Sequence, residues 1–232
     1  MLEKRCLLSV KALLEDEELF HKACKKLDEQ RLKKVQMIKG REGKAQSVGA
    51  GLLLQGIVQE RLFQSTFLAG DIVVSQNEGQ PRLTGYTVQE LLDSLESPVE
   101  IEYSYGRLGK PYLQKKFCCF SLSHSGEYVF CAVSDREIGA DIQRCLPRKD
   151  HNLEKRFFSE RERLLLEGRS GEERENLFYR LWTKKEAYGK LTGDGIGQAV
   201  GMDTEALSDR VSFEEWQLPG QYCMAVCRYL VS

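Results

Sequence analysis

The chain has 232 residues, of which 41% are hydrophobic and 30% are charged, and its formal net charge is −1. This length suits one large domain or two small ones, and the composition is typical of a soluble globular protein. A near-neutral chain has no global basic field, so non-specific binding to nucleic acid or to an anionic membrane is not expected, and no run approaches the roughly 18 apolar residues of a membrane span.

The eight cysteines are scattered, and several lie in apolar runs that resemble strands. The first residues do not resemble a signal peptide, because their apolar stretch is short and is interrupted by Lys11. We therefore expect a reduced, cytoplasmic protein in which the cysteines serve as small core residues. A structural zinc site is not favoured, since there is no C-x-x-C pair and the chain has only three histidines.

The first predicted element in chain order, over residues 4–14, is either a strand or the start of a short helix. A helix with acidic residues in its first turn follows over 16–27. A glycine-containing apolar run over 47–63 predicts a buried helix. A basic cluster lies between these two helices, and by itself it indicates only a solvated face. Its members are Arg31, Lys33, Lys34, Lys39, Arg41 and Lys44.

Short strand-like segments and turns fill residues 70–110, after which the pattern becomes richer in strands. The later predicted elements are two strands joined by a turn over 117–134, a strand over 138–143, helices at about 159–168 and 174–191, and a hairpin over 211–230. No linker or internal repeat is evident. We predict an α+β fold.

Asp141 lies in the apolar strand Ile138–Gln143. Alternation along a strand sends Ile138, Ala140 and Ile142 to one face and Gly139, Asp141 and Gln143 to the other. One face would pack, and the other would carry a carboxylate and an amide. From this strand alone, an aspartate that caps the following turn is an equally good interpretation.

Glu186 and Lys190 are one turn apart on the second long helix, and Trp182 precedes Glu186 by one further turn. An exposed ion pair worth about 0.3–0.5 kcal/mol is the simplest interpretation of the two charges. The glycines after this helix indicate a helix end, because a phosphate-binding loop would precede a helix. Upstream, His124 stands between two serines, where it offers donors to an anion or has no special role.

Taken together, these segments resemble the 4′-phosphopantetheinyl transferases. The family pattern pairs (I/V)-G-(I/V)-D with a later (F/W)-(S/C/T)-x-K-E-(A/S)-x-x-K, and this chain has Ile138–Asp141 and, after 40 intervening residues, Trp182–Lys190. The blocks "YGRLGKPYL", "SLSHSGEYVFCAV" and "EKRFFSERE" extend the resemblance over about residues 105–192. In the first half it rests mainly on "REGKAQS".

The length resembles the larger, surfactin-synthetase-activating class. This class implies two similar α+β halves related by a pseudo-two-fold axis, here residues 1–112 and 113–232, with the active site at their interface. It implies an enzyme that moves the phosphopantetheine arm of coenzyme A to a serine of an apo acyl, polyketide or peptidyl carrier protein and releases 3′,5′-ADP. It also implies a monomer.

The resemblance assigns Asp141 and Glu186 as magnesium ligands, and two carboxylates suit octahedral Mg²⁺. It assigns Lys190 to the diphosphate of coenzyme A, where it would act with both carboxylates in catalysis. Glu186 is the best candidate for the base, although a metal-bound hydroxide is equally compatible.

Coenzyme A contacts are implied for five further residues: Ser123, His124, Lys110 and, from the weaker match in the first half, Arg41 and Ser47. The loop after the strand of Asp141 corresponds to the carrier-docking region. There Leu146, Leu153, Phe157, Arg148 and Lys149 would suit an acidic carrier helix with an apolar patch.

Gln143 departs from the family, because many members have Asp-x-Glu in this strand. An amide oxygen can ligate Mg²⁺ but brings no charge, so we expect weaker metal binding whether or not Gln143 is a ligand. Ala140, in place of the usual isoleucine or valine, is a packing change. Gln143 also makes a second function conceivable, in which the protein binds coenzyme A or a carrier with little or no turnover. A structural α+β protein whose motif is coincidental would bind no coenzyme A.

Overall fold

The computed structural model describes residues 3–60, 82–114, 118–148, 152–218 and 221–230. The end of the helix expected over 47–63, together with Lys149 and His151, lies outside these ranges. The elements of the first part of the chain are β1 (Glu3–Ser9), α1 (Lys11–Glu15), α2 (Glu17–Cys24), α3 (Glu29–Met37), α4 (Arg41–Val58), β2 (Leu83–Tyr86), α6 (Val88–Ser94), β3 (Tyr103–Tyr105), β4 (Pro111–Leu113), β5 (Cys119–Ser125) and β6 (Tyr128–Ser134).

The second part contains β7 (Ile138–Arg144), α7 (Asn152–Phe157), α8 (Glu160–Glu167), α9 (Gly171–Thr192), the short 3-10 helices Ile196–Ala199 and Glu205–Leu207, β8 (Val211–Leu218) and β9 (Tyr222–Tyr229). The predicted α+β class is confirmed. The expected strand 138–143, the two later helices and the hairpin over 211–230 all form within a few residues of their predicted bounds.

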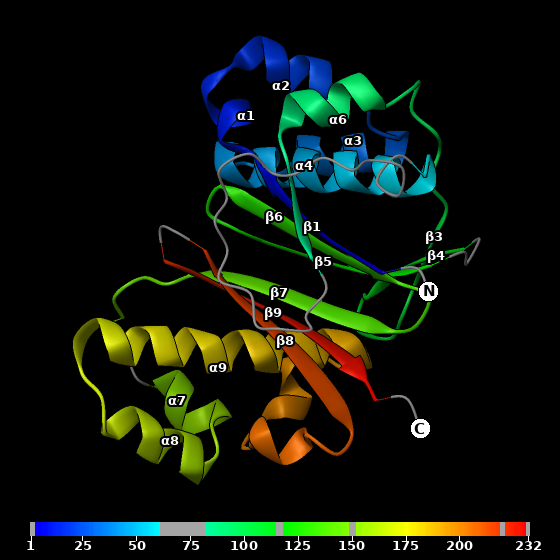
Figure 1. Cartoon of the computed structure of the whole chain (residues 1–232). Coiled ribbons are helices and arrows are strands. Elements are labelled where there is room, and N and C mark those ends of the chain that lie inside the picture. Colours follow the sequence, from blue (N-terminus) through cyan, green and yellow to red (C-terminus); the bar gives the residue numbers. More distant parts are fainter. Residues whose placement is uncertain (1–2, 61–81, 115–117, 149–151, 219–220, 231–232) are drawn as a thin grey trace.

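The first sheet has the strand order β2-β1-β6-β5. Helices α1, α2, α3, α4 and α6 cover one of its faces (Figure 1). The long helix α4 is buried along most of its length, as its apolar run predicts. Its glycines permit close packing, since a Cβ at Gly49 would lie 2.5 Å from Val10 and one at Gly51 would lie 2.6 Å from Leu27.

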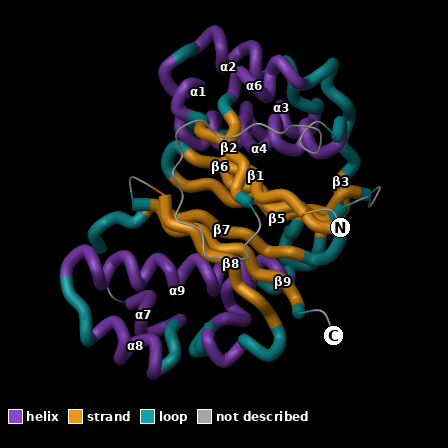
Figure 2. Tube along the Cα trace, viewed as in Figure 1, coloured by secondary structure: helices purple, strands orange, loops and turns teal. Residues whose placement is uncertain are grey.

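The second sheet has the order β7-β9-β8, with all strands antiparallel to their neighbours. It lies beneath the first sheet, and α9 covers its other face, with α7 and α8 beyond (Figures 1 and 2). A hydrophobic cluster joins the facing sides of the two sheets, and it includes Phe130 and Ala132 of β6 with Ile138, Ala140 and Ile142 of β7. The face of β7 predicted to pack therefore does so.

Strands β5 and β6 hydrogen-bond within the sheet that contains the N-terminal strand β1. Along the chain they follow residue 112, where two halves were expected to meet. Long-range pairing with β1 thus draws residues 119–134 into the first sheet, and the second sheet begins only with Ile138. The pseudo-two-fold relation between halves stays a prediction.

A buried ion pair joins α9 to α8. The Lys185 ammonium lies 2.9 Å from the Glu162 carboxylate and also donates to the carbonyl of Met202, and both charged side chains are almost fully buried. Glu162 also accepts hydrogen bonds from the amide and hydroxyl of Thr204. Because buried charges require partners, this network restricts how α9 can lie against its surroundings.

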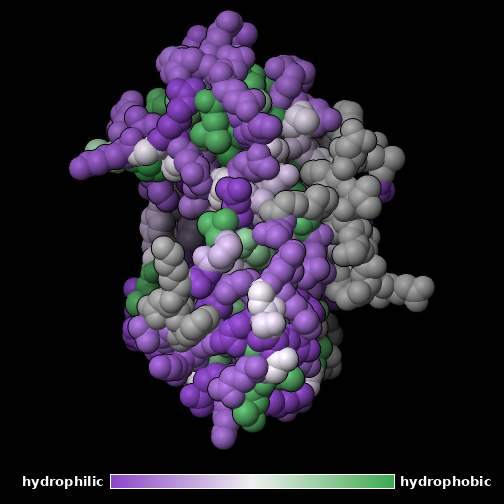
Figure 3. Space-filling model, turned by 90° about the vertical axis from the view of Figure 1, so that its left-hand side faces the viewer, coloured by the Kyte–Doolittle hydropathy of each residue, from purple (hydrophilic) through white to green (hydrophobic). Residues whose placement is uncertain are grey.

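The face of the molecule in Figure 3 is mostly hydrophilic, with small separate hydrophobic areas. Within the described part of the chain, every helix is too short or too polar to cross a membrane.

Candidate functional site

Asp141 lies on β7, on the side that faces α9, and its side chain is 2% exposed. Its Oδ1 accepts hydrogen bonds from Ser123 Oγ at 2.6 Å and from Lys190 Nζ at 2.8 Å. Its Oδ2 accepts one from Gln143 Nε2 at 3.0 Å. A buried carboxylate with three such donors is well satisfied, so the alternative of a turn cap is excluded.

A glycine brings α9 close to this strand. Gly139 is two residues before Asp141 on the same face, and a Cβ there would overlap the carbonyl oxygen of Ala187 and the amide nitrogen of Leu191. Only a residue without a side chain permits this approach. As a result, Lys190 reaches Asp141 from a helix 49 positions later in the chain.

Glu186 lies one turn before Lys190 on α9 and is partly buried. Burial, followed by the negative charge of Asp141, raises the pKa of the Glu186 carboxyl, and the positive charge of Lys190 opposes this effect. The two carboxylates are therefore close enough to repel each other, as the sequence predicts. The hydrogen bonds and ion pairs of the described residues include none to the Glu186 side chain.

The residues present fit a divalent cation at this place. Within the described ranges no group of three or more His, Cys, Asp and Glu side chains gathers as a metal site. However, Mg²⁺ needs few protein ligands and keeps several waters. The mutual repulsion between Asp141 and Glu186 is what a bound cation would relieve, and Gln143 adds an amide beside them.

The Gln143 side-chain amide nitrogen donates a hydrogen bond to Asp141 Oδ2 at 3.0 Å. A glutamate at this position would instead place a second negative charge against Asp141. In this structure the departure from the family pattern therefore acts as a hydrogen-bond donor to the central carboxylate. Whether the amide oxygen also ligates a metal stays a prediction.

A row of serines on β5 contacts β7, although the two strands belong to different sheets. Ser121 Oγ accepts from the amide of Ala140 at 2.9 Å, and Ser125 Oγ accepts from the amide of Arg144 at 2.9 Å. Between them, Ser123 donates to Asp141. These side chains replace the backbone ladder that neighbouring strands usually form, and they position Asp141 relative to the first sheet.

His124 follows Ser123 and is exposed at the end of β5. Partial desolvation, then the positive charges of Lys190 and of Lys34 on α3, lower the pKa of the His124 imidazole. Two lysines from distant segments thus lie near one histidine. Lys34 was not singled out in the sequence, because within the basic cluster nothing distinguishes it from its solvated neighbours. It is exposed in the structure as well, and partial desolvation followed by the positive charge of Arg31 lowers the pKa of its ammonium group.

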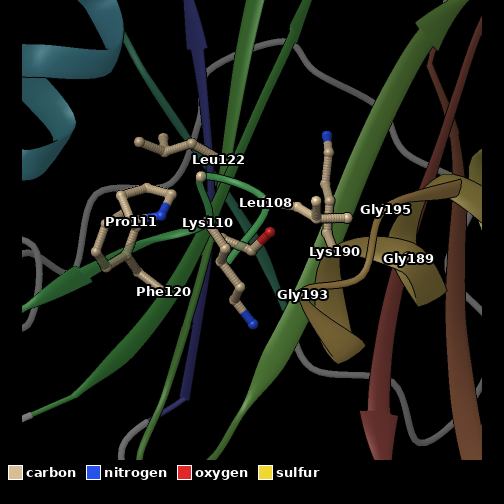
Figure 4. A pocket seen from close by; sticks show the side chains of 11 residues that line it. Leu108, Lys110, Pro111, Phe120, Leu122, Gly189, Lys190, Gly193 and Gly195 are labelled. Carbon is tan, nitrogen blue, oxygen red and sulfur yellow. The ribbon is translucent and has the colours of Figure 1, made fainter. Parts of the chain in front are cut away.

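A cavity of about 230 Å³ lies between the loop before β4, strand β5 and the end of α9. Lys110 and Lys190 line it, and Figure 4 shows it bordered by Pro111, Phe120 and Gly193. The Lys110 ammonium donates to Glu137 Oε2 at 2.9 Å and to the carbonyl of Leu191 at 3.1 Å. The cavity therefore combines two lysine ammonium groups with apolar walls, and it lies next to the carboxylates of Asp141 and Glu186.

The two site residues predicted on α4 have different surroundings. Arg41 is exposed and donates to Glu17 Oε2 at 2.6 Å and to the carbonyl of Leu14. Ser47 is buried, and its hydroxyl has no hydrogen-bond partner in the described part of the structure. Gln46 donates to the carbonyl of Gly126, so α4 does reach the turn that follows His124. No described contact brings Arg41 or Ser47 to Asp141.

Arg148, suggested by the sequence as a docking charge, is paired within the chain, and its role in docking stays a prediction. Its side chain is 11% exposed and pairs with Glu154 at 2.8 Å and Glu175 at 2.7 Å. Its guanidinium carbon also lies 3.1 Å from the ring centre of Phe178. Phe157 is buried as well. A local pattern of basic and apolar residues cannot reveal that partners elsewhere in the chain cover them.

Leu146 and Leu153 of the same region are exposed, at 51% and 41%. Of the residues suggested for docking that the structure describes, these two expose apolar side chains. Lys149 lies outside the described residues.

Comparison with known proteins gives a family match to the second half of the chain. Residues 137–227 match the model of the 4′-phosphopantetheinyl transferase superfamily. This range begins just before β7 and ends in β9, and so it contains Asp141, Gln143, Glu186 and Lys190.

Three relatives illustrate the similarity, and the first of them is matched over most of its length. The 4′-phosphopantetheinyl transferase AcpT of Salmonella typhimurium is 34% identical over 170 residues, which cover 70% of this chain and 87% of AcpT. The transferase HetI of Nostoc is 42% identical over 44% of this chain and 45% of HetI. A protein of Synechocystis named as a putative 4′-phosphopantetheinyl transferase is 36% identical over 55% of this chain and 57% of its own length. The chain therefore spans about half the length of the last two relatives.

Proposed function

Because this chain belongs to the 4′-phosphopantetheinyl transferase superfamily, we propose that it transfers the phosphopantetheine arm of coenzyme A to a serine hydroxyl of an apo carrier protein. The reaction would depend on Mg²⁺ and release 3′,5′-ADP. The carrier would be an acyl, polyketide or peptidyl carrier protein. We further propose that the enzyme acts as a monomer in the cytoplasm.

One observation carries this proposal. Asp141 on β7 meets Lys190 on α9 at 2.8 Å, with Glu186 near enough for its pKa to respond to Asp141. Phosphoryl transfer needs positioned cations and carboxylates more than it needs a covalent intermediate. A cluster of two carboxylates and a lysine beside a cavity with a second lysine supplies those groups.

Asp141 and Glu186 would hold the magnesium ion, with Gln143 as a third neighbour. When bound, Mg²⁺ supplies a hard cation that neutralises the diphosphate. Lys190 is held beside the same place by Asp141, and its ammonium would bind the diphosphate oxygens and stabilise their growing charge. Ser123 keeps Asp141 in position through its 2.6 Å hydrogen bond, so we assign it a positioning role beside its predicted phosphate contact.

The proton of the attacking serine needs an acceptor, and Glu186 is the best placed. Burial and the charge of Asp141 raise the pKa of its carboxyl, which makes it a stronger base than an exposed glutamate. The described residues give it no competing hydrogen bond, so the carboxylate oxygen that does not bind the cation would be open to a proton from the carrier serine.

Coenzyme A would extend from this cluster along the cavity that Lys110 and Lys190 line. His124 and Lys34 are near each other and offer donors to a phosphate. The Ser47 hydroxyl has no partner among the described residues, but it is buried, so its contact with coenzyme A would require the surrounding side chains to move apart. Arg41 would need to release Glu17 before it could bind a phosphate.

Mass spectrometry of carrier proteins tests the proposed activity. The protein is mixed with coenzyme A, Mg²⁺ and apo carriers of the acyl, polyketide and peptidyl classes. We expect at least one carrier to gain the phosphopantetheine arm on its acceptor serine. If no carrier gains mass while coenzyme A still binds, the protein is a binding module and the transferase proposal is wrong.

The pH dependence of coenzyme A binding tests the role of His124. Its free imidazole has a lowered pKa, whereas a bound phosphate would raise that pKa by favouring the imidazolium. Binding then takes up a proton, so affinity is full below the free pKa and falls as pH rises through the bound pKa. We expect affinity to weaken from pH 5 to pH 8, and a difference of one pKa unit between the free and bound imidazole sets about tenfold as the upper limit of this loss.

Calorimetry of wild type and His124→Gln at the two pH values measures this effect. The phosphates of coenzyme A titrate in the same range, and the slope of the variant isolates that background. If the affinity for coenzyme A changes equally with pH in the two proteins, His124 does not contact a phosphate.

Carrier docking is expected to depend on Leu153 rather than on Arg148. Leu153→Asp replaces exposed apolar surface with a charge, so the KM for the carrier should rise by about tenfold while the melting temperature stays unchanged. Arg148→Glu instead places a negative charge against Glu154 and Glu175 and should cost about 3–5 kcal/mol of stability. An unchanged carrier KM in Leu153→Asp would place docking elsewhere.

A further inference from the structure

Two thiols meet where β7 ends. Cys145 follows the last residue of β7, and Cys223 is the second residue of β9. Their Sγ atoms are 3.3 Å apart and share a hydrogen bond. Both cysteines are free, and both side chains are buried.

The backbone holds this pair in place. Cys223 lies opposite Gln143 in the β7–β9 ladder. The amide of Cys145 donates to the carbonyl of Gln221 at 2.6 Å, which continues the pairing beyond the end of β7. The short sulfur separation therefore follows from strand register. A disulfide bond of about 2.05 Å requires the sulfurs to approach by only about 1.3 Å more.

One member of the pair borders a cavity. Cys145 lines a cavity of about 430 Å³ together with Leu146, Pro147, Asn176 and Gln221. Cys223 is not among the lining residues, and its sulfur lies 3.9 Å from the carbonyl of Asn176 on α9. A small oxidant that enters this cavity meets Cys145 first and finds Cys223 directly behind it.

We propose that Cys145 and Cys223 are a redox-modification site that forms a reversible disulfide when hydrogen peroxide oxidises the protein. The Cys145 thiolate attacks the O–O bond and takes one oxygen as a sulfenic acid, while the other oxygen leaves as water. The Cys223 sulfur then attacks Cys145, so that an S–S bond forms and a second water departs. In total two thiols lose two protons and two electrons, and one peroxide becomes two waters.

The disulfide would fix the start of the Leu146–Arg148 segment to β9. This segment forms part of the cavity wall and carries the exposed Leu146. The chemistry of the pair does not depend on the transferase activity, so it can be tested on the protein alone.

The test is peptide mapping of the full chain before and after hydrogen peroxide, with free thiols blocked by N-ethylmaleimide and no reductant in the digest. Trypsin places Cys145 in peptide 145–148 and both Cys223 and Cys227 in peptide 211–228. We expect these peptides to be linked after oxidation, with a mass two hydrogens below the sum of peptide 145–148 and peptide 211–228 carrying one N-ethylmaleimide on Cys227, and to separate again in dithiothreitol.

Two variants and one internal comparison identify the partner. The linked species should persist in Cys227→Ser and disappear in Cys223→Ser, and fragmentation of the wild-type species assigns the bond even where a variant folds poorly. Cys6 and Cys131 lie opposite each other in the buried first sheet, and we expect both to remain as free thiols. Persistence of the link in Cys223→Ser, or complete alkylation of Cys145 after peroxide, would overturn the proposal.

Discussion

Asp141→Asn and Glu186→Gln are each expected to lower kcat/KM for transfer by about 10²–10³-fold, the loss typical of removing one group that stabilises a charged transition state. Each change removes one negative charge from the pair that would hold Mg²⁺ while it keeps the shape of the side chain. In Asp141→Asn the amide oxygen can still accept from Ser123 or Lys190. The melting temperature should therefore change little, and activity should recover partly at high Mg²⁺ concentration.

Steady-state kinetics across a magnesium titration measures this result. Matched controls are Asp135→Asn and Glu167→Gln, which make the same chemical changes at exposed positions and should leave kcat/KM unchanged. Near-normal rates in either site variant would contradict the assignment of that residue to the metal. If both site variants instead unfold, far-ultraviolet circular dichroism reveals it before kinetics are compared.

Gly139→Ala is expected to lower both stability and activity. An added methyl group would overlap the backbone of α9 at Ala187 and Leu191, where no flexible side chain can move aside. Overpacking of this kind usually costs about 1–3 kcal/mol. Displacement of α9 from β7 would also move Glu186 and Lys190 away from Asp141, so kcat should fall more than stability alone explains.

Thermal unfolding and kinetics at a temperature well below the midpoint separate the two effects. Gly168→Ala is the matched control, because a Cβ there would lie 3.8 Å from its nearest neighbour, the carbonyl oxygen of Leu164. Full activity in a folded Gly139→Ala protein would show that the β7–α9 spacing does not position the site.

Two kinds of feature could be predicted from the sequence. The alternation in Ile138–Gln143 correctly separated the packed face from the face of Asp141, and the periodicity of residues 174–191 correctly placed Glu186 and Lys190 on one helix. Both patterns are local, since a strand repeats every two residues and a helix every 3.6. Gly139, two residues before Asp141 on the same face, also fits this pattern, because a close approach of two backbones requires a residue without a side chain.

The tertiary structure alone decided which distant residues join the site. Ser121 and Ser125 reach β7 from another sheet, and Lys34 approaches His124 from α3. No local period encodes such contacts, because they depend on how separate elements pack. The same limit applies to Arg148, whose ion-pair partners Glu154 and Glu175 lie on two later helices.

Local sequence patterns were thus enough to place Asp141 on a strand and Glu186 with Lys190 on a helix. Three contacts became known only from the folded chain: Lys190 lies 2.8 Å from Asp141, Gln143 donates to that carboxylate, and the sulfur of Cys145 lies beside that of Cys223. The period of a helix or strand depends on residues that are close in the sequence. Side-chain contacts between elements arise only when strands and helices far apart in the chain pack together.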